Sequence, residues 1–387
     1  MPMREIPDRY LGMIIHFLMN FHNDTSEFRH PHLRKSFQKK TYIFFVFMYG
    51  ALVVIGFIAN IILIRNILIR REYNMSMYKY LAFNAVNDIL KCIIVLPLAL
   101  STTLFQNWFY GSFLCYLFPM LQDVPFHATM LTLLLITFDR YRQIVYPLKQ
   151  PIPTFLAMLG VWVVTLFAVL PYAVYTRYLD LEAYFGPQFK GTGICAINLD
   201  DNIEEYIRGL FIIMYVLPLV LVAFLHVKSS EEIKARQTAF TVSYHDINTE
   251  RNNVPSLNPL QTAVPNNNQL NERPLHFETL TSEDGKDWNA EKQMQEFLVT
   301  AVILYALCLL PLNMVRLLKH VVYETYETSF QFDCTFITAV WLAFCPTITT
   351  PLIFQQKTGI HNSNISRYLR LGGRSSDVST YEIEQTL

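Results

Sequence analysis

The sequence predicts an all-α membrane protein, a seven-transmembrane helix bundle with a short amphipathic helix after the seventh span. Of its 387 residues, 52% are apolar and only 16% are charged. Soluble domains carry roughly 25% charged residues. The apolar residues gather in seven blocks of about 20 to 28 residues, long enough to cross roughly 30 Å of hydrocarbon. Several blocks contain polar residues, which is typical of helices packed in a bundle.

The seven blocks predict transmembrane spans at 42–64, 78–104, 113–145, 154–175, 203–227, 297–322 and 332–354. The only long polar stretch, residues 229–292, is rich in Asn, Thr, Glu and Pro. It has no helical or strand periodicity, so we expect a mostly disordered loop there. After the last span, apolar residues alternate with basic ones, which is typical of a helix on the membrane surface. The predicted segments are a tail (1–41), helices one to five (42–228), the loop (229–292), helices six and seven (293–356), and the surface helix and tail (357–387).

Short loops rich in Lys and Arg place the N-terminus outside and the C-terminus in the cytoplasm of a multi-pass plasma-membrane protein. A glycosylation sequon at Asn23 agrees with an outside N-terminus. The apolar run at 10–19 is consistent with a signal peptide or with a hydrophobic patch in an extracellular tail.

Several function classes are disfavoured by composition and motifs. The formal net charge is zero, which gives no electrostatic case for nucleic-acid binding. The six cysteines include no C-x-x-C pair, so neither a zinc site nor a redox motif is predicted. No catalytic triad, phosphate loop or metal cluster is evident, and we do not expect an enzyme.

The third span carries the most specific motifs. It begins at Cys115 and ends in the triplet Asp139-Arg140-Tyr141. The sequence CLLP in the sixth span ends at Pro311, and TPLIF in the seventh contains Pro351. In this order the motifs resemble those of rhodopsin-like (class A) G-protein-coupled receptors, most closely the neuropeptide receptors. Further landmark positions of that family are matched by Asn60, Asp88, Trp108, Gly111, Trp162 and Pro218.

The resemblance implies a disulfide between Cys115 and Cys195, which would hold the second outer loop over the mouth of the bundle. It also implies an allosteric sodium ion at Asp88, with Thr129 and Asn60 as helpers. An acid at mid-membrane depth must be paired, protonated or bound to a cation. The alternative is a protonated Asp88 hydrogen-bonded to Asn84, Asn87 or Thr350.

For activation, the resemblance assigns G-protein coupling to Arg140, locked by Asp139 and by Glu291 on the sixth helix. The alternative is that Arg140 and Glu291 are solvated interfacial charges, whose pairing contributes only about 0–1 kcal/mol. Other expected relay positions are Tyr141, His226, Pro311, Pro351 and Phe354. The family's tryptophan and tyrosine are replaced at Leu309 and Phe354, so the usual relay is altered.

The expected ligand pocket lacks two familiar features. Amine receptors have an aspartate eighteen residues before the arginine of the triplet, where this chain has Gln122. Asp123 is adjacent, but one residue along a helix rotates a side chain by about 100°. Opsins have a retinal lysine where this chain has Phe344. By position, the resemblance assigns the pocket to Gln122, Asp123, Phe126, Leu312, Asn313, Arg316 and Val340.

The resemblance therefore implies a receptor for an extracellular neuropeptide, with a heterotrimeric G protein, arrestin and membrane lipid as partners. One alternative is a receptor-like protein with weak, constitutive or decoy signalling, which the altered sixth and seventh spans favour. Another is a seven-span transporter. A transporter would need paired intramembrane ions or a repeated hydropathy pattern, and neither is evident in the sequence.

Overall fold

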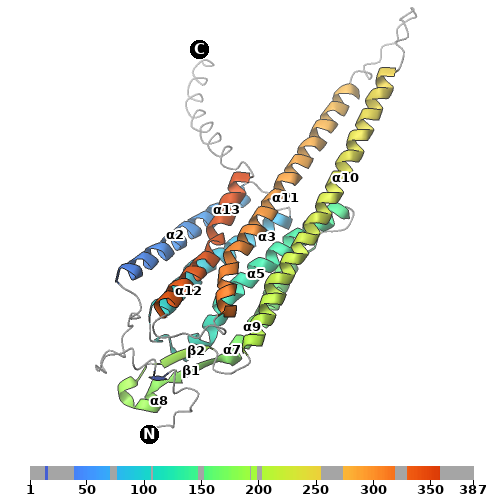
Figure 1. The fold of residues 1–387 in the computed structure, drawn as a ribbon. Coiled ribbons are helices and arrows are strands. Elements are labelled where there is room, and N and C mark those ends of the chain that lie inside the picture. Colours follow the sequence, from blue (N-terminus) through green and yellow to red (C-terminus); the bar gives the residue numbers. More distant parts are fainter. Residues whose placement is uncertain are drawn as a thin grey trace, which may run out of the picture. The chain divides into compact units, whose positions relative to one another are not determined.

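The computed structural model describes residues 14–15, 39–69, 76–105, 108–146, 152–191, 193–197, 203–253, 273–318 and 329–357. Within these residues, seven helical segments are long and apolar enough to cross a membrane. They are Lys39–Ile69, Ser76–Leu104, Gly111–Val145, Thr154–Tyr175, Ile203–Ala239, Lys292–Leu318 and Gln331–Gln356. The predicted all-α, seven-span fold is confirmed (Figure 1).

The spans consist of one or more helical elements each. They are α2 (Lys39–Ile69); α3 (Ser76–Leu90), η3 (Lys91–Val95) and α4 (Leu96–Leu104); α5 (Gly111–Val145); α6 (Thr154–Val169) and α7 (Pro171–Tyr175); α9 (Ile203–Phe211), η5 (Ile212–Val216) and α10 (Leu217–Asn253); α11 (Arg273–Leu318); and α12 (Ser329–Phe344) and α13 (Pro346–Lys357).

Two of these spans contain a π-helical turn at the same distance from a proline. The turn η3 ends at Val95, two residues before Pro97, and η5 ends at Val216, two residues before Pro218. A proline has no N–H to donate, and its ring clashes with the carbonyl four residues earlier. A widened turn relieves that clash and lets the helix continue.

The described chain divides into two compact units. The first contains Met1–Asp139, Pro151–Val222 and Ala301–Ile353, and the second contains Arg140–Gln150, Ala223–Thr300 and Phe354–Leu387. The main hydrophobic core lies in the first unit and consists of buried residues from α2, η3, α4, α5, η5, α10, α11 and α12. In the second unit, Phe354 packs edge-on against Phe297, with ring centroids 5.3 Å apart.

Buried hydroxyl groups link the helices of the first unit. Tyr49 on α2 donates to the carbonyl of Ile337 on α12 at 2.8 Å. Tyr305 on α11 donates to the carbonyl of Phe126 on α5 at 2.6 Å. Because lipid tails are as apolar as the side chains, hydrogen bonds and close packing, rather than the hydrophobic effect, hold membrane helices together.

Gly56 on α2 allows a close approach between helices. A Cβ atom there would lie 3.1 Å from both the Cys92 sulfur and a methyl carbon of Thr347.

We expect Gly56→Leu to destabilise the protein by about 1–3 kcal/mol through overpacking, measured by thermal unfolding in detergent. Gly50→Leu on the same helix is the control, because nothing lies within 4 Å of its Cβ position. Equal melting temperatures for the two variants would contradict the predicted close packing.

A β-hairpin connects the fourth and fifth spans. Strand β1 (Thr176–Asp180) pairs antiparallel with β2 (Gly193–Ile197), and Tyr178 lies opposite Cys195. Between the strands lie α8 (Leu181–Phe185) and η4 (Pro187–Phe189). Burial, followed by the charge of Asp180, raises the pKa of Tyr178 above its usual range. Its phenol is therefore neutral at physiological pH.

Helix covers more of 229–292 than we expected. Helix α10 continues to Asn253, and α11 begins at Arg273. Good helix formers directly after the fifth apolar block favour the continuation of α10: Glu231, Glu232, Lys234, Ala235 and Gln237. The remaining part of the predicted loop lies outside the described residues. Asn23, the apolar run at 10–19 and the predicted surface helix after residue 357 fall mainly or entirely outside them too.

Candidate functional site

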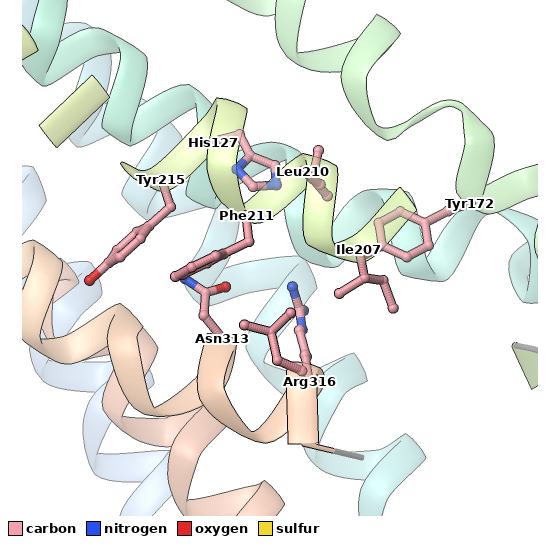
Figure 2. A pocket seen from close by; sticks show the side chains of 9 residues that line it. His127, Tyr172, Ile207, Leu210, Phe211, Tyr215, Asn313 and Arg316 are labelled. Carbon is pink, nitrogen blue, oxygen red and sulfur yellow. The ribbon is translucent and has the colours of Figure 1, made fainter. Parts of the chain in front are cut away.

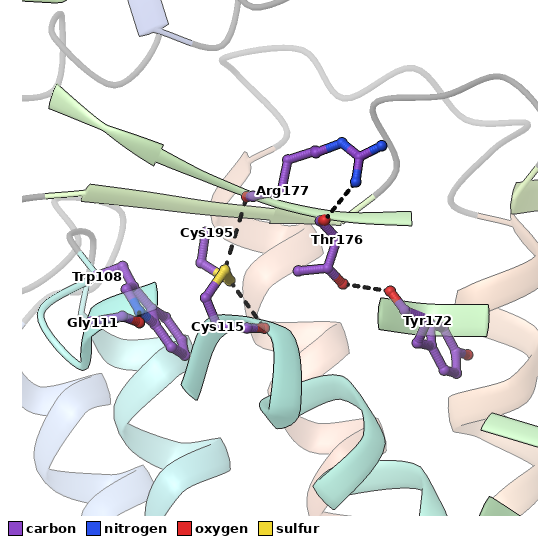
Figure 3. Close-up of a disulfide and its surroundings, with 7 residues drawn as sticks. All are labelled: Trp108, Gly111, Cys115, Tyr172, Thr176, Arg177 and Cys195. Carbon is purple, nitrogen blue, oxygen red and sulfur yellow. Dashed lines mark hydrogen bonds between the residues drawn. A yellow bond between two sulfur atoms is a disulfide. The ribbon is translucent and has the colours of Figure 1, made fainter. Parts of the chain in front are cut away.

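The hairpin is tied to the first turn of α5 by the Cys115–Cys195 disulfide (Figure 3). Trp108 pairs with Gly193 through two backbone hydrogen bonds, and its indole nitrogen donates to the Gly111 carbonyl at 2.7 Å. The predicted disulfide is therefore present. It closes a loop of 80 residues and fixes β2 at this end of the first unit.

A cavity lies among α5, α7, α9, η5 and α11 (Figure 2). Its lining combines aromatic and aliphatic side chains with polar groups. The lining residues are His127, Tyr172, Ile207, Leu210, Phe211, Tyr215, Asn313, Arg316 and Leu317. Polar and apolar groups contribute about equally to the lining of this small cavity, and convergent polar groups are one mark of a ligand site.

An ion pair connects α5 and α11 at this cavity. The Arg316 guanidinium donates to both carboxylate oxygens of Asp123, at 2.6 and 3.0 Å. The Asp123 side chain is 2% exposed and that of Arg316 18% exposed. Two parallel hydrogen bonds make this the strongest geometry for an arginine–carboxylate pair. Asp123 therefore faces Arg316, and its charge is balanced without a ligand.

Two buried polar atoms at the cavity have no hydrogen-bond partner among the described residues. They are Nε2 of His127 and Nδ2 of Asn313. Leaving a buried donor or acceptor unsatisfied costs about 1–3 kcal/mol. A polar ligand that supplied an acceptor to the Asn313 amide would remove part of that cost. These atoms are therefore the best candidates for direct ligand recognition.

The predicted pocket residues separate into two groups. Asn313 and Arg316 line the cavity, and Asp123 reaches it through the ion pair. The others are buried away from the cavity lining: Gln122 is 9% exposed, while Phe126, Leu312 and Val340 belong to the main hydrophobic core. Ligand contact by those residues stays a prediction, because a position shared with a family does not determine which neighbour fills the space.

Several lining residues were not predicted, and His127 is the clearest example. It lies one helical turn after Asp123, and ionisable residues inside a membrane usually mark a functional site. That signal was available in the sequence. No such signal in the sequence marked the aromatic residues Tyr172, Phe211 and Tyr215, because most aromatic residues in a membrane helix face lipid or core.

The neighbours of buried Asp88 differ from those expected of a sodium site. Lys91 Nζ lies 2.7 Å from Asp88 Oδ1 and 2.8 Å from Thr129 Oγ1. The amide of Asn60 donates elsewhere, to backbone carbonyls of α2 and α13 at 2.8 Å each. The Lys91 ammonium group thus donates hydrogen bonds to the two oxygen atoms, of Asp88 and Thr129, that were expected to bind sodium. The residues present therefore do not fit a sodium ion.

The expected hydrogen bond from Asn84 to Asp88 is present only as a long contact of 3.5 Å. Lys91 is a site residue that none of the motifs marks. Its signal is spacing, because acidic and basic residues three apart on a helix lie on the same face. The two intramembrane ion pairs also correct our expectation that the sequence contains none.

The predicted activation residues are placed as follows. Asp139 is buried at the end of the first unit, and Arg140 begins the second. Pro311 and Pro351 lie inside α11 and α13, Phe354 is fully buried, and His226 is half-buried. The Glu291 side chain lies outside the described residues, so its pairing with Arg140 stays a prediction.

Residues 59–354 match the family described as 7 transmembrane receptor (rhodopsin family). Among similar proteins, neuropeptide Y receptor type 2 of Gallus gallus is 28% identical over 200 residues, covering 50% of this chain and 51% of that protein. Neuropeptide F receptor of Drosophila melanogaster is 26% identical over 212 residues, covering 52% and 44%. Neuropeptide Y receptor type 5 of Sus scrofa is 23% identical over 189 residues, covering 47% and 42%. The chain spans about half the length of these relatives.

Proposed function

Because the chain belongs to the rhodopsin family of seven-transmembrane receptors, we propose that it is a G-protein-coupled receptor for an extracellular peptide. The observation that carries this proposal is the cavity at the disulfide-bearing end of the first unit, with its unsatisfied Asn313 amide. The peptide class is supported by the relatives, which are named as receptors for neuropeptides Y and F.

The proposed topology has the N-terminus outside, the hairpin and cavity facing the extracellular side, and Arg140 facing the cytoplasm. Positive charges in the short loops between spans support it. In this orientation a peptide would enter beside the hairpin and present a carbonyl or carboxylate group to Asn313. Arg316 is already paired with Asp123, so a charged ligand group would have to compete with that pair.

The proposed mechanism is a shift between two populations of the bundle. A ligand can shift such an equilibrium only by as much as its affinities for the two states differ. A peptide held between α5, η5 and α11 would favour the arrangement of α11 that exposes Arg140 to the G protein. Arrestin and membrane lipid are further proposed partners.

The proposal is tested by G-protein recruitment in cells exposed to a peptide library. We expect at least one peptide to increase recruitment. Asn313→Ala should then lower its potency about 2- to 12-fold, the equivalent of one hydrogen bond worth roughly 0.5–1.5 kcal/mol. Arg140→Ala should remove recruitment while peptide binding remains.

Leu307→Ala is the matched control for Asn313→Ala, because this side chain is exposed on the same helix. It should leave potency unchanged. If no peptide changes recruitment while surface expression is normal, the peptide-receptor proposal fails.

The alternative function is constitutive, weak or decoy signalling. It is favoured by Leu309 and Phe354, both buried where the family has a tryptophan and a tyrosine. Recruitment without any peptide, lost in Arg140→Ala, would support constitutive activity. The family match favours either receptor function over a transporter.

A further inference from the structure

Asp88 and Lys91 form an ion pair buried in the first unit. Both side chains are 3% exposed, and the distance from Nζ to Oδ1 is 2.7 Å. Charges at this depth are costly unless they are paired and hydrogen-bonded. The pair lies on adjacent elements of one span, because α3 ends at Leu90 and the π turn begins at Lys91.

Hydrogen bonds hold the lysine in one position. Its Nζ also donates to Thr129 Oγ1 at 2.8 Å. Thr129 in turn donates to the Pro125 carbonyl at 2.9 Å and accepts from Asn87 Nδ2 at 3.2 Å. Thr129 is thus fixed by two further contacts, and it directs the ammonium group toward α5.

A second monovalent cation has no favourable place here. An ion bound to Asp88 and Thr129 would lie within about 4 Å of Nζ, where two like charges repel each other strongly even at an effective dielectric constant near 20. That repulsion corresponds to roughly a 1000-fold loss of affinity. Asn60, the remaining expected ligand, donates its amide hydrogens to backbone carbonyls, and its buried Oδ1 has no partner among the described residues. That single amide oxygen does not offset the repulsion between a second cation and Nζ.

We infer that Lys91 is a covalently attached cation that takes the place of sodium at Asp88, so that this receptor does not respond to sodium ions. The site's positive charge is permanent rather than exchangeable with the solvent. This inference does not depend on which ligand the receptor binds, and it goes beyond the proposed function.

The test compares thermal unfolding of the purified full-length protein in detergent, in sodium chloride and in choline chloride at equal ionic strength. The wild type should have the same melting temperature in both salts. Lys91→Met removes the charge but keeps an unbranched side chain, and should make the site bind sodium. At about ten times the dissociation constant, its melting temperature should rise by roughly 2 °C in sodium alone.

Three controls separate the lysine from general salt effects. Lys228→Met removes a lysine paired with Glu231 at the surface and should stay insensitive to sodium. Asp88→Asn combined with Lys91→Met should lose the sodium response, because the carboxylate is gone. Lys91→Arg keeps the charge and should behave as the wild type.

Two results would overturn the inference. One is a sodium-specific rise in the wild type. The other is a folded Lys91→Met variant without any sodium response, because Lys91 would then not be the group that excludes the ion. If Lys91→Met does not fold, Lys91→Gln is measured in the same way, and the wild-type comparison still decides the first point.

Discussion

Arg316→Ala and Asp123→Ala should each destabilise the receptor by about 3–5 kcal/mol, because either change leaves an uncompensated charge in a buried site. The Asp123 carboxylate is 2% exposed and receives two short hydrogen bonds from Arg316. The loss is measured as a lower melting temperature in detergent without ligand. The pair joins α5 to α11, so we also expect weaker packing around the cavity.

The double variant Asp123→Leu with Arg316→Met is the informative comparison. Replacing both partners of a buried ion pair with apolar residues of similar volume is often neutral or stabilising. We therefore expect the double variant to recover most of the lost stability. It should still respond less to an agonist, because Arg316 lines the cavity.

Arg208→Ala is the matched control for charge removal. Arg208 pairs with Glu205 at 2.6 Å and Glu204 at 3.3 Å, but its side chain is 51% exposed. Exposed pairs are worth about 0–1 kcal/mol. If both pocket variants unfold at the same temperature as Arg208→Ala, the Asp123–Arg316 pair does not contribute as the geometry implies.

Cys195→Ser should cause the second large loss of stability, about 2–4 kcal/mol. The disulfide closes a loop of 80 residues, for which chain entropy gives an upper limit of roughly 4.5 kcal/mol. Membrane-inserted helices already restrict the unfolded chain, so the measured loss should lie below that limit. We also expect a loss of surface expression, because β2 is held at α5 through this bond.

Cys115→Ser and the double cysteine variant should lose as much as Cys195→Ser, since all three remove the same bond. Cys334→Ser removes a free thiol and should unfold at the wild-type temperature. The measurement is thermal unfolding in detergent with and without a reductant. An equal effect of the reductant on the wild type and Cys195→Ser would contradict a structural role for the bond.

The helices were predictable because crossing a membrane imposes a length and a hydropathy that can be read locally. Within the site, Asn313 and Arg316 were predictable from their positions relative to Pro311. Lys91 and His127 match no family motif, but both are ionisable residues within spans, three and four residues after an aspartate, so the sequence carried a signal for each. By contrast, Phe126 and Val340 occupy pocket positions in sequence but pack in the core.

The sequence by itself determined the seven spans, through hydropathy, and the family resemblance, through motifs at specific spacings. The cysteine pair followed from that resemblance. Only the tertiary structure decided which charges meet. Asp88 binds its own neighbour Lys91, and Asp123 is paired with Arg316, 193 residues along the chain. The physical reason is that a buried charge must be balanced within a few ångströms. For Asp88 the balancing group is three residues along the same span, whereas for Asp123 helix packing brings it from a distant part of the chain.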